Sequence, residues 1–413
     1  FWLKLSRGPC GQSSLQVSAA IGVAAEAMSA RNAMKPPANG VVAPAPRGGC
    51  CRRFCTFLVA AVAIMVGVGV KSGFVVQSIP GDEQVASFST IYSSVSGNDQ
   101  HSAYDADVAA SFYNLANEFY EYGWGDSFHF GFRRKWEPFS KSITNTQNFV
   151  AQKLHVGDMD RVLDMGCGIG GPMRGVVRAT GANVTGLTIN AHQIKRGREI
   201  TSHLSPFMQQ RCHFSLQDYL NVKGLEENTY DAAFYMESSL HCENRTKTFA
   251  EAFKLLKPGG RLVAMEYVTI GDWDPKNAEH QELMRQHLHG NGAARTPSIQ
   301  EDLAMVRAAG FEVKEHFDFM EYGQRVYGEE NWPWWADLQP HWPTDPRRVM
   351  LPVHPYVRWS QPKVLWLLSA LGILPENVPR TAEVMNEGAD GLTGLGRLNA
   401  ITPQYYIGAV KPR

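Results

Sequence analysis

A glycine-rich loop is the part of the sequence whose residue types and spacing best suggest chemistry. Gly166, Gly168 and Gly171 follow the short segment 161–165, and Asp164 lies just before the loop. Glycines at this spacing let the backbone approach a ligand closely at a helix N-terminus, and they also satisfy the dinucleotide-binding fingerprint. The loop alone is weak evidence, because several nucleotide-like ligands bind to such loops.

Polar residues beyond the loop separate two kinds of ligand. A dinucleotide site requires an acid at the end of the second strand to bind the ribose. The sequence has Thr188 and Asn190 there, with Gln193 one turn later, whereas acids follow the third and fourth expected strands at Asp218 and Glu237. This order fits a cofactor with a cationic amino-acid group and no pyrophosphate. We therefore predict an S-adenosylmethionine site.

Each part of this cofactor has an expected partner. Asp164 is expected to bind the amino-acid group, Asn190 the ribose and Asp218 the adenine, although Asp218 is also a candidate helix cap. The predicted cofactor-binding residues are Asp164, Gly166, Cys167, Gly168, Gly170, Thr188, Asn190, Gln193, Gln217, Asp218 and Glu237.

Alternating strands and helices must position this loop. Pro172 suits the first turn of the helix after the loop, and the Lys-Pro-Gly-Gly segment 257–260 is expected to end a later helix. A capping box from Ser298 to Glu301 begins a further helix. The expected strands are 161–165, 183–187, 212–216, 230–236, 261–265 and about 313–319.

This order of elements predicts an α/β fold with an open, doubly wound, Rossmann-like sheet of mostly parallel strands. In such folds a ligand binds at the carboxyl ends of the strands, where the strand order reverses. We therefore expect a binding site between the ends of the first and fourth strands.

Several stretches together resemble the sterol 24-C-methyltransferase family, over roughly two thirds of the chain. The aromatic stretch before the glycine loop is the most distinctive of them, because most other adenosylmethionine enzymes lack it. The matching stretches are 119–125 with 127–130, 164–172, 184–190, 266–268, 290–292, and 391–392 ahead of 401–403.

The resemblance implies a class I methyltransferase sheet whose last strand, 404–410, is antiparallel to the others. It implies electrophilic methylation of a sterol side-chain alkene at carbon 24, in sterol biosynthesis. Two departures from the family pattern bear on the choice of sterol and on regiochemistry. Residues 287–289 read His-Leu-His where the family usually has a glutamate, and the motif after the fourth strand reads Glu-Ser-Ser-Leu-His over 237–241.

Methylation of an alkene moves positive charge from sulfur onto a tertiary carbon of the substrate. Faces of aromatic rings stabilise such a cation by roughly 0.5–2 kcal/mol each. We favour this role over ordinary core packing, because the segment 121–125 is too glycine-rich for a regular helix and includes an acid. The expected substrate-pocket residues are Tyr113, Tyr120, Trp124, Phe128 and Phe130, with Tyr122 as a catalytic residue.

A base must then accept the final proton. His241 and Glu237 follow the fourth strand, and Glu266 is expected to end the fifth. Either His241 or Glu266 could accept the proton, which typically contributes about 10²–10⁴-fold to the rate. We expect no metal, because the thirteen histidines are scattered and zinc-type spacing is absent.

The sequence suggests five regions. Residues 1–53 are expected to be basic and disordered, and 54–76 to contain a hydrophobic membrane anchor. Residues 77–150 are expected to be a linker and an aromatic substrate-binding helical region. Residues 151–320 form the predicted cofactor-binding core. Residues 321–413 are expected to be a C-terminal sterol methyltransferase region with the last strand. Its aromatic-rich insertion is expected to contact the membrane interface, to form a lid over an apolar substrate, or to pack between the last two strands.

The family resemblance implies a setting at the endoplasmic reticulum membrane, and we expect the catalytic domain to face the cytosol, where the cofactor is made. A plastid location is the alternative, because the basic N-terminus also resembles a transit peptide. The arginines around the anchor favour a cytosolic N-terminus, which conflicts with this topology if the segment spans the membrane once. A homo-oligomer is compatible with the sequence.

Composition narrows the classes of function. Forty acids balance forty bases, so a nucleic-acid partner is not expected. Seven cysteines in a chain of 413 residues do not indicate a disulfide framework. Three alternatives stay open: a methyltransferase of another lipid, such as a tocopherol-type phenol or an unsaturated acyl chain; an NAD(P)-dependent oxidoreductase; and a lipid-binding module without activity.

Overall fold

A computed structural model describes residues 112–113, 116–117, 120–121, 123–339, 355–372, 374 and 377–413. Contacts divide the chain into two units, 1–61 and 62–413, and every described residue belongs to the second. The expected N-terminal regions 1–53 and 54–76 lie outside the described residues, as does Tyr122. Within the described part of the chain, no helix combines the length and apolar character that a membrane span requires.

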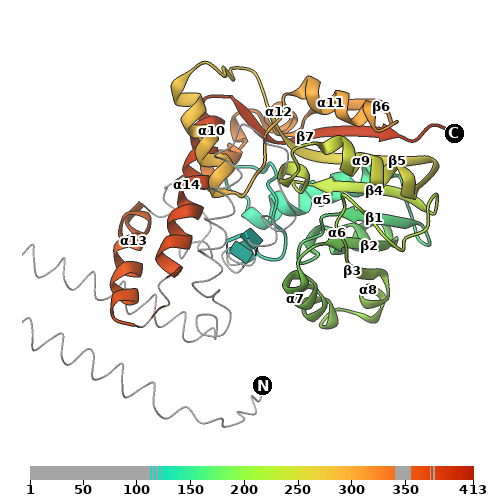
Figure 1. The fold of residues 1–413 in the computed structure, drawn as a ribbon, viewed down its shortest axis with the longest axis horizontal. Helices are drawn as coiled ribbons and strands as arrows, with labels where there is room; N and C mark the ends of the chain where they lie inside the picture. The colour runs from blue at the N-terminus through green and yellow to red at the C-terminus, as the bar shows by residue number, and fades with distance from the viewer. Residues whose placement is uncertain are drawn as a thin grey trace, which may run out of the picture. The chain divides into compact units, whose positions relative to one another are not determined.

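A seven-stranded sheet forms the centre of the described unit, with the order β3-β2-β1-β4-β5-β7-β6 (Figure 1). The first five strands are parallel to one another, and β7 runs antiparallel to both β5 and β6. The mostly parallel sheet and its antiparallel last strand are therefore confirmed. The strands are β1 (Arg161–Met165), β2 (Asn183–Thr188), β3 (Cys212–Leu216), β4 (Tyr230–Met236), β5 (Leu256–Thr269), β6 (Glu312–Asp318) and β7 (Ile401–Val410).

Two strands are longer than the sequence predicts. β7 begins at Ile401 rather than at residue 404, and β5 begins at Leu256 rather than at 261. The Lys-Pro-Gly-Gly segment 257–260 therefore belongs to β5, although the preceding helix does end just before it. Glu266 lies inside β5 and does not end it, because pairing with β7 continues to Thr269.

Helices cover both faces of this sheet. The helix after the glycine loop has a proline in its first turn, and the capping box of Ser298 with Glu301 is formed in full, as predicted. The α-helices are α5 (Phe139–Leu154), α6 (Gly171–Thr180), α7 (Ala191–Ser202), α8 (Pro206–Arg211), α9 (Arg245–Leu255), α10 (Ala278–Gly290), α11 (Ile299–Ala308), α12 (Phe319–Tyr327), α13 (Pro355–Ala370) and α14 (Asn377–Arg397).

Alternating side chains of the strands form two separate cores. In β1, Val162 packs on one face together with Val150 of α5, whereas Leu163 packs on the other face together with Phe249 of α9. These four side chains are completely or almost completely buried. Burial on both faces fixes the register of the parallel strands, because a shift by one residue would exchange the two cores.

The aromatic segment before Gly125 is helical at its described positions, contrary to the expectation from its glycines. The backbone N–H of Gly125 donates to the carbonyl of Glu121, and Gly125 then takes a positive φ of 79° that ends the helix. Glu121 forms an ion pair with Arg196 of α7. A glycine costs a helix about 1 kcal/mol, which packing and this ion pair offset.

Glycines also set the crossing of α10 and α14. A Cβ atom on Gly290 would collide with the backbone of Gly388, and one on Gly391 would collide with the backbone of α10. The two helices therefore approach one another more closely than larger side chains allow. This contact positions the turn 291–292, which follows α10 and reaches the site described below.

Candidate active site

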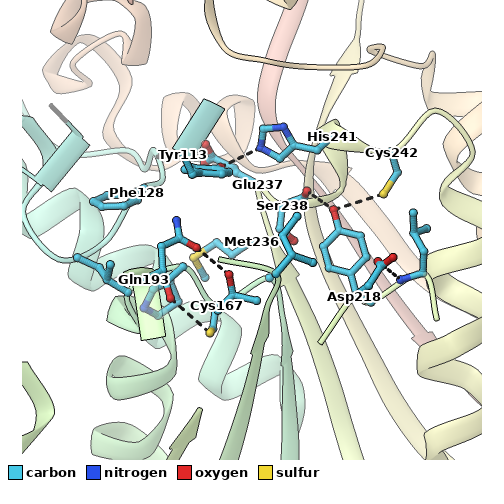
Figure 2. Close-up of a pocket in the computed structure, with 18 of the residues that line it drawn as sticks. Tyr113, Phe128, Cys167, Gln193, Asp218, Met236, Glu237, Ser238, His241 and Cys242 are labelled. Carbon is cyan, nitrogen blue, oxygen red and sulfur yellow. Dashed lines mark hydrogen bonds between the residues drawn. The ribbon is translucent and has the colours of Figure 1, made fainter. Parts of the chain in front are cut away.

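A pocket lies at the carboxyl ends of β1 and β4, where the sequence predicts a ligand site (Figure 2). Its walls come from the glycine loop, from the turn after β2, from the turn after β3 and from the segment after β4. The lining residues are Tyr113, Asp126, Phe128, Gly166, Cys167, Gly168, Ile169, Pro172, Thr188, Ile189, Gln193, Asp218, Tyr219, Leu220, Met236, Glu237, Ser238, His241 and Cys242.

The glycine loop forms one wall because its backbone is left-handed at three positions. Gly166, Gly168 and Gly170 have φ values of 108°, 53° and 84°. A Cβ on Gly166 would approach Cβ of Ser238 to 2.5 Å, whereas nothing lies within 3.9 Å of one on Gly168. Gly166 thus permits close packing of the two loops, and Gly168 leaves open space beside the pocket. Such a loop fits a nucleotide-like ligand.

Arg174 fixes the loop from behind, although the sequence analysis did not select it. Its guanidinium donates to the carbonyl of Ile169 at 2.8 Å and pairs with Asp126 at 3.0 Å. The arginine side chain is 1% exposed. It therefore links the glycine loop to Asp126, which directly follows the helical aromatic segment.

Asp164 lies at the base of the loop with 1% exposure. Its carboxyl accepts from the backbone N–H of Met173, while Oδ2 has no partner among the described residues. Burial raises the pKa of this carboxyl well above its usual range. A buried acceptor without a partner is compatible with a cationic ammonium group nearby. Asp164 is not itself among the lining residues, so its predicted contact with the amino-acid group stays a prediction.

The turn after β2 is held by its own side chains. The Thr188 hydroxyl donates to Oε1 of Gln193 at 2.7 Å, and Asn190 caps α7 by accepting from the backbone of Gln193. Thr188 and Gln193 line the pocket, together with Ile189, but Asn190 does not. The predicted ribose contact of Asn190 therefore stays a prediction, and the capping role is the one that the structure shows.

Residues after β3 divide into two roles. Asp218 lines the pocket, and its Oδ1 accepts from the backbone N–H of Leu220 at 2.8 Å. Gln217 is turned away, because its amide bonds both backbone groups of Lys223. Tyr219, which sequence reasoning missed, also lines the pocket and donates to the carbonyl of Ser238. Asp218 and Tyr219 thus form the wall opposite the β2 turn.

Aromatic rings continue from the pocket into the core as one connected group. Tyr113 and Phe128 line the pocket, and each lies beside Tyr120, with ring centroids 6.4 and 5.5 Å away. Trp124 lies 5.6 Å from Tyr120 and 5.9 Å from Phe130. The predicted rings are therefore gathered beside the crevice and are not scattered. Tyr120, Trp124 and Phe130 lie behind the wall instead of forming it.

His241 forms a short hydrogen-bonded chain with Tyr113 at the pocket edge (Figure 2). Nδ1 of His241 lies 2.8 Å from the carbonyl of Gly292, so this nitrogen must be the protonated one. Nε2 is then an acceptor for the Tyr113 hydroxyl at 2.8 Å. Burial lowers the pKa of His241 to about 4 and raises that of Tyr113 above its ordinary value.

Glu237 has an unusual backbone and a buried carboxyl. Its φ of 52° is positive, which for a residue with a side chain costs of order 1–3 kcal/mol. Oε1 accepts from the backbone N–H of Phe130 and from Nε2 of Gln404, both at 2.7 Å. Burial is the main reason that the pKa of Glu237 is raised to about 8. Strain combined with a perturbed acid is typical of functional sites.

Glu266 lies behind this wall and does not line the pocket. Its Oε1 accepts from the backbone N–H groups of Ser238 and Ser239, and the residue is completely buried. The carboxylate therefore shapes the loop after β4. This position does not favour Glu266 as a proton acceptor for a ligand in the pocket.

Among the described residues, no group of three or more potential metal ligands is close enough to hold an ion. The expectation of a metal-free site stays a prediction. Cys167 and Cys242 both line the pocket, and burial raises the pKa of each thiol above its usual range. Neither thiol is therefore activated as a nucleophile.

The sheet order, the glycine loop and the pocket after β4 define an S-adenosylmethionine-dependent methyltransferase of class I. The family model of mycolic acid cyclopropane synthetase matches residues 100–344, and that of the sterol methyltransferase C-terminal region matches 350–413. The chain belongs to the sterol methyltransferase family.

Relatives support this assignment. Cycloartenol-C-24-methyltransferase of Arabidopsis thaliana is 32% identical, over 74% of this chain and 87% of its own length. A sterol 24-C-methyltransferase of Saccharomyces cerevisiae is 30% identical, over 73% and 78%. A cyclopropane synthase from Mycobacterium tuberculosis shares the fold, with a TM-score of 0.55 and 16% identity over 76% of this chain and 100% of its own.

Proposed function

We propose that this methyltransferase transfers a methyl group to carbon 24 of a sterol side chain. The observation that carries the proposal is the connected set of rings, from Tyr113 through Tyr120 to Trp124, beside the glycine loop. The relatives named above act, by their names, on cycloartenol and on carbon 24 of sterols. An apolar alkene and a transient tertiary cation both suit such surroundings.

Methyl transfer to an alkene moves one positive charge onto the substrate and releases one proton. S-adenosylmethionine supplies a methyl group on a positively charged sulfur. The alkene π electrons form the new carbon–carbon bond while the carbon–sulfur bond breaks, and the positive charge moves to the side chain. Loss of a proton from a neighbouring carbon restores a double bond. The chain must therefore hold two reactants in line, tolerate a cation and accept one proton.

Tyr113 and His241 are suited to accept that proton. Nε2 of His241 is unprotonated because Nδ1–H is committed to the carbonyl of Gly292. Both residues line the pocket. The Tyr113 oxygen can take a proton from the substrate as its own proton passes to Nε2. Of the two bases expected from the sequence, only His241 lies on the pocket wall, and we propose it as the final acceptor.

The direct test is expression of the chain in a host that lacks its own sterol methyltransferase. Mass spectrometry should then find sterols with a heavier side chain. A chain carrying Gly168→Val, which would fill the open wall of the glycine loop, is the matched control and should yield none. Unchanged host sterols with a folded, adenosylmethionine-binding enzyme would contradict the proposal.

One observation favours a second candidate substrate. The family model of mycolic acid cyclopropane synthetase matches residues 100–344, which include the whole pocket. An unsaturated acyl chain offers the same kind of alkene to the same site. Lipid analysis of the host described above distinguishes the two, because methyl-branched or cyclopropane acyl chains would appear in place of modified sterols.

We also propose attachment to the endoplasmic reticulum membrane, with the catalytic unit facing the cytosol. The uncharged segment 54–70 supports attachment. Trp359 and Trp366 of α13 are also 55% and 48% exposed, and tryptophan favours the membrane interface. Protease digestion of sealed microsomes should remove the C-terminus. Protection of the C-terminus, or import into plastids, would overturn this location.

A further inference from the structure

Gln404 of β7 makes an unusual contact with the strained acid of the pocket. Its Nε2 donates to Oε1 of Glu237 at 2.7 Å and to the carbonyl of Phe130 at 2.8 Å. The residue is completely buried. A single amide therefore joins the last strand, the end of β4 and the aromatic segment.

The orientation of this amide is fixed by its partners. A carboxylate oxygen and a carbonyl oxygen both accept hydrogen bonds, so the atom between them must be the NH₂ group. The other end of the amide, Oε1, is buried and has no partner among the described residues. Leaving a buried acceptor unpaired is unfavourable. The two hydrogen bonds donated by the NH₂ group therefore fix the amide in an orientation that leaves its oxygen without a partner among the described residues.

Only uncharged donors hold the Glu237 carboxyl. Besides Gln404, these are the backbone N–H of Phe130 and the hydroxyl of Tyr267. No ion pair within the described residues includes Glu237. A buried carboxylate without a cation is unfavourable until a positively charged ligand arrives. The same pocket is the one expected to receive a sulfonium group.

We propose that Gln404 is a positioning residue, whose amide holds the Glu237 carboxylate at the pocket edge to balance the positive charge that moves from the sulfonium to the substrate. This inference rests on the proposed function and adds a residue to it. Glu237 is predictable from its place after the fourth strand, whereas Gln404 is not, because their contact joins positions 167 residues apart.

Binding of two cofactor forms separates charge from shape. S-adenosylmethionine carries the sulfonium, whereas S-adenosylhomocysteine has a neutral sulfur in its place. The ratio of their dissociation constants, measured by calorimetry, therefore reports the effect of a negative charge near sulfur. The Glu237 pKa of about 8 means that a bound cation must displace its proton at neutral pH. Preference for the sulfonium form should accordingly increase as pH rises from 6.5 towards 8.

Other groups near Glu237 do not reproduce this dependence. Burial keeps the three nearby tyrosines protonated over that range, and His241 stays neutral because its pKa is about 4. Burial likewise raises the pKa of Cys167, Tyr219 and Cys242. The same pH series is measured with Glu237→Gln as a control. Any pH dependence of the ratio that remains in this variant comes from titration of the ligands and is subtracted. The titratable residues that face Glu237 or share its pocket are Tyr113, Tyr120, Asp126, Cys167, Asp218, Tyr219, His241, Cys242, Glu266 and Tyr267.

The test is a double-mutant cycle on the full chain with Glu237→Gln and Gln404→Leu. Each single change should reduce the preference for the sulfonium form by about tenfold, and the double change should reduce it no further. Thr402→Val is the matched control. It removes a buried hydroxyl of β7 that bonds Asp318 and not Glu237, and it should leave the ratio unchanged.

Three results would overturn the inference. The ratio could be unaffected by Gln404→Leu, the two changes could act additively, or the wild type could bind neither ligand, which would also overturn the proposed function. If Gln404→Leu does not fold, Gln404→Met keeps the length of the side chain and removes the same donors. Turnover of each variant should follow its binding ratio.

Discussion

The hydroxyl of Tyr113 lies 2.8 Å from Nε2 of His241, although 128 residues separate the two in the sequence. The rings meet edge to face, with centroids 5.1 Å apart. Because Gly292 fixes the opposite nitrogen of the imidazole, the lone pair of Nε2 is directed at a hydroxyl on the pocket wall. A proton that leaves the substrate at this wall therefore has a defined acceptor.

Loss of the acceptor should slow turnover without preventing cofactor binding. We expect His241→Ala to reduce kcat by about 10²–10⁴-fold and Tyr113→Phe by less, since water can replace a hydroxyl. The dissociation constant for S-adenosylhomocysteine should change little. Steady-state kinetics with calorimetry check this, and a fully active His241→Ala enzyme would rule out the proposed acceptor.

The three buried histidines should contribute less to stability as the solution becomes acidic. Burial lowers the pKa of His129 and His241 to about 4 and that of His287 to about 3, from 6.5 when exposed. Between these values the unfolded chain binds more protons, so folding is favoured fully above pH 6.5 and progressively less below it. Complete protonation would cost roughly 3–5 kcal/mol per group, of which roughly 2 kcal/mol per group is lost by pH 5. The raised pKa of Glu237 acts in the opposite direction over this range, so the histidine contribution is measured as a difference between two proteins. In urea unfolding at pH 7.5 and 5, His287→Gln should lose less stability on acidification than the wild type, and an equal change in both would contradict the prediction.

Replacing an aromatic ring at or behind the pocket wall by an aliphatic side chain should reduce turnover more than it reduces stability. Phe128 lines the pocket, and Trp124 lies in the next layer. We expect Phe128→Leu or Trp124→Leu to lower kcat roughly tenfold through loss of cation stabilisation. Phe253→Leu is the control, because that ring packs against Phe311 in the other core. Unchanged kcat in both pocket variants would favour a phenol acceptor, which needs no such stabilisation.

A larger side chain between α10 and α14 should push the two helices apart and displace the turn that contacts His241. Gly290→Ala places a methyl group against the backbone of Gly388, and we expect a loss of about 1–3 kcal/mol in stability. The displaced turn at Gly292 should also weaken the bond to His241 and reduce turnover. Gly157→Ala is the matched control, because nothing lies within 4 Å of its Cβ. Thermal unfolding of both variants decides whether the two glycines differ as expected.

Much of the sheet could be predicted from the sequence because patterns within single segments indicate where most strands begin and end. β1 to β4 are short apolar segments that end at polar turns, and their ranges differ from expectation by at most one residue. β5 and β7 were wrong at their starts. The added residues of β7 pair with the end of β5, as Ile401 does with Thr269, and the early start of β5 pairs Leu256 with Tyr230 of β4. Patterns within one segment do not contain the information for either pair.

The site was predictable in its parts but less so in its arrangement. The spacing of the glycines predicts the loop, in which three of them take a positive φ, and the acids of the pocket follow the ends of strands. Gln404 with Glu237, Arg174 with Asp126, and the carbonyl of Gly292 with His241 are contacts between distant segments, so spacing gives no sign of them. The Gly290-Asn-Gly292 and Ile401-Thr-Pro403 matches were the only signals near two of these groups.

We expect the enzyme to transfer a methyl group to a sterol alkene in the pocket lined by Tyr113 and Phe128. The most direct measurement incubates the purified enzyme with isotopically labelled S-adenosylmethionine and a sterol that has an unsaturated side chain. Nuclear magnetic resonance of the product should locate the labelled methyl on carbon 24. Label found only on an acyl chain or an aromatic hydroxyl, with the sterol recovered unchanged, would contradict the claim.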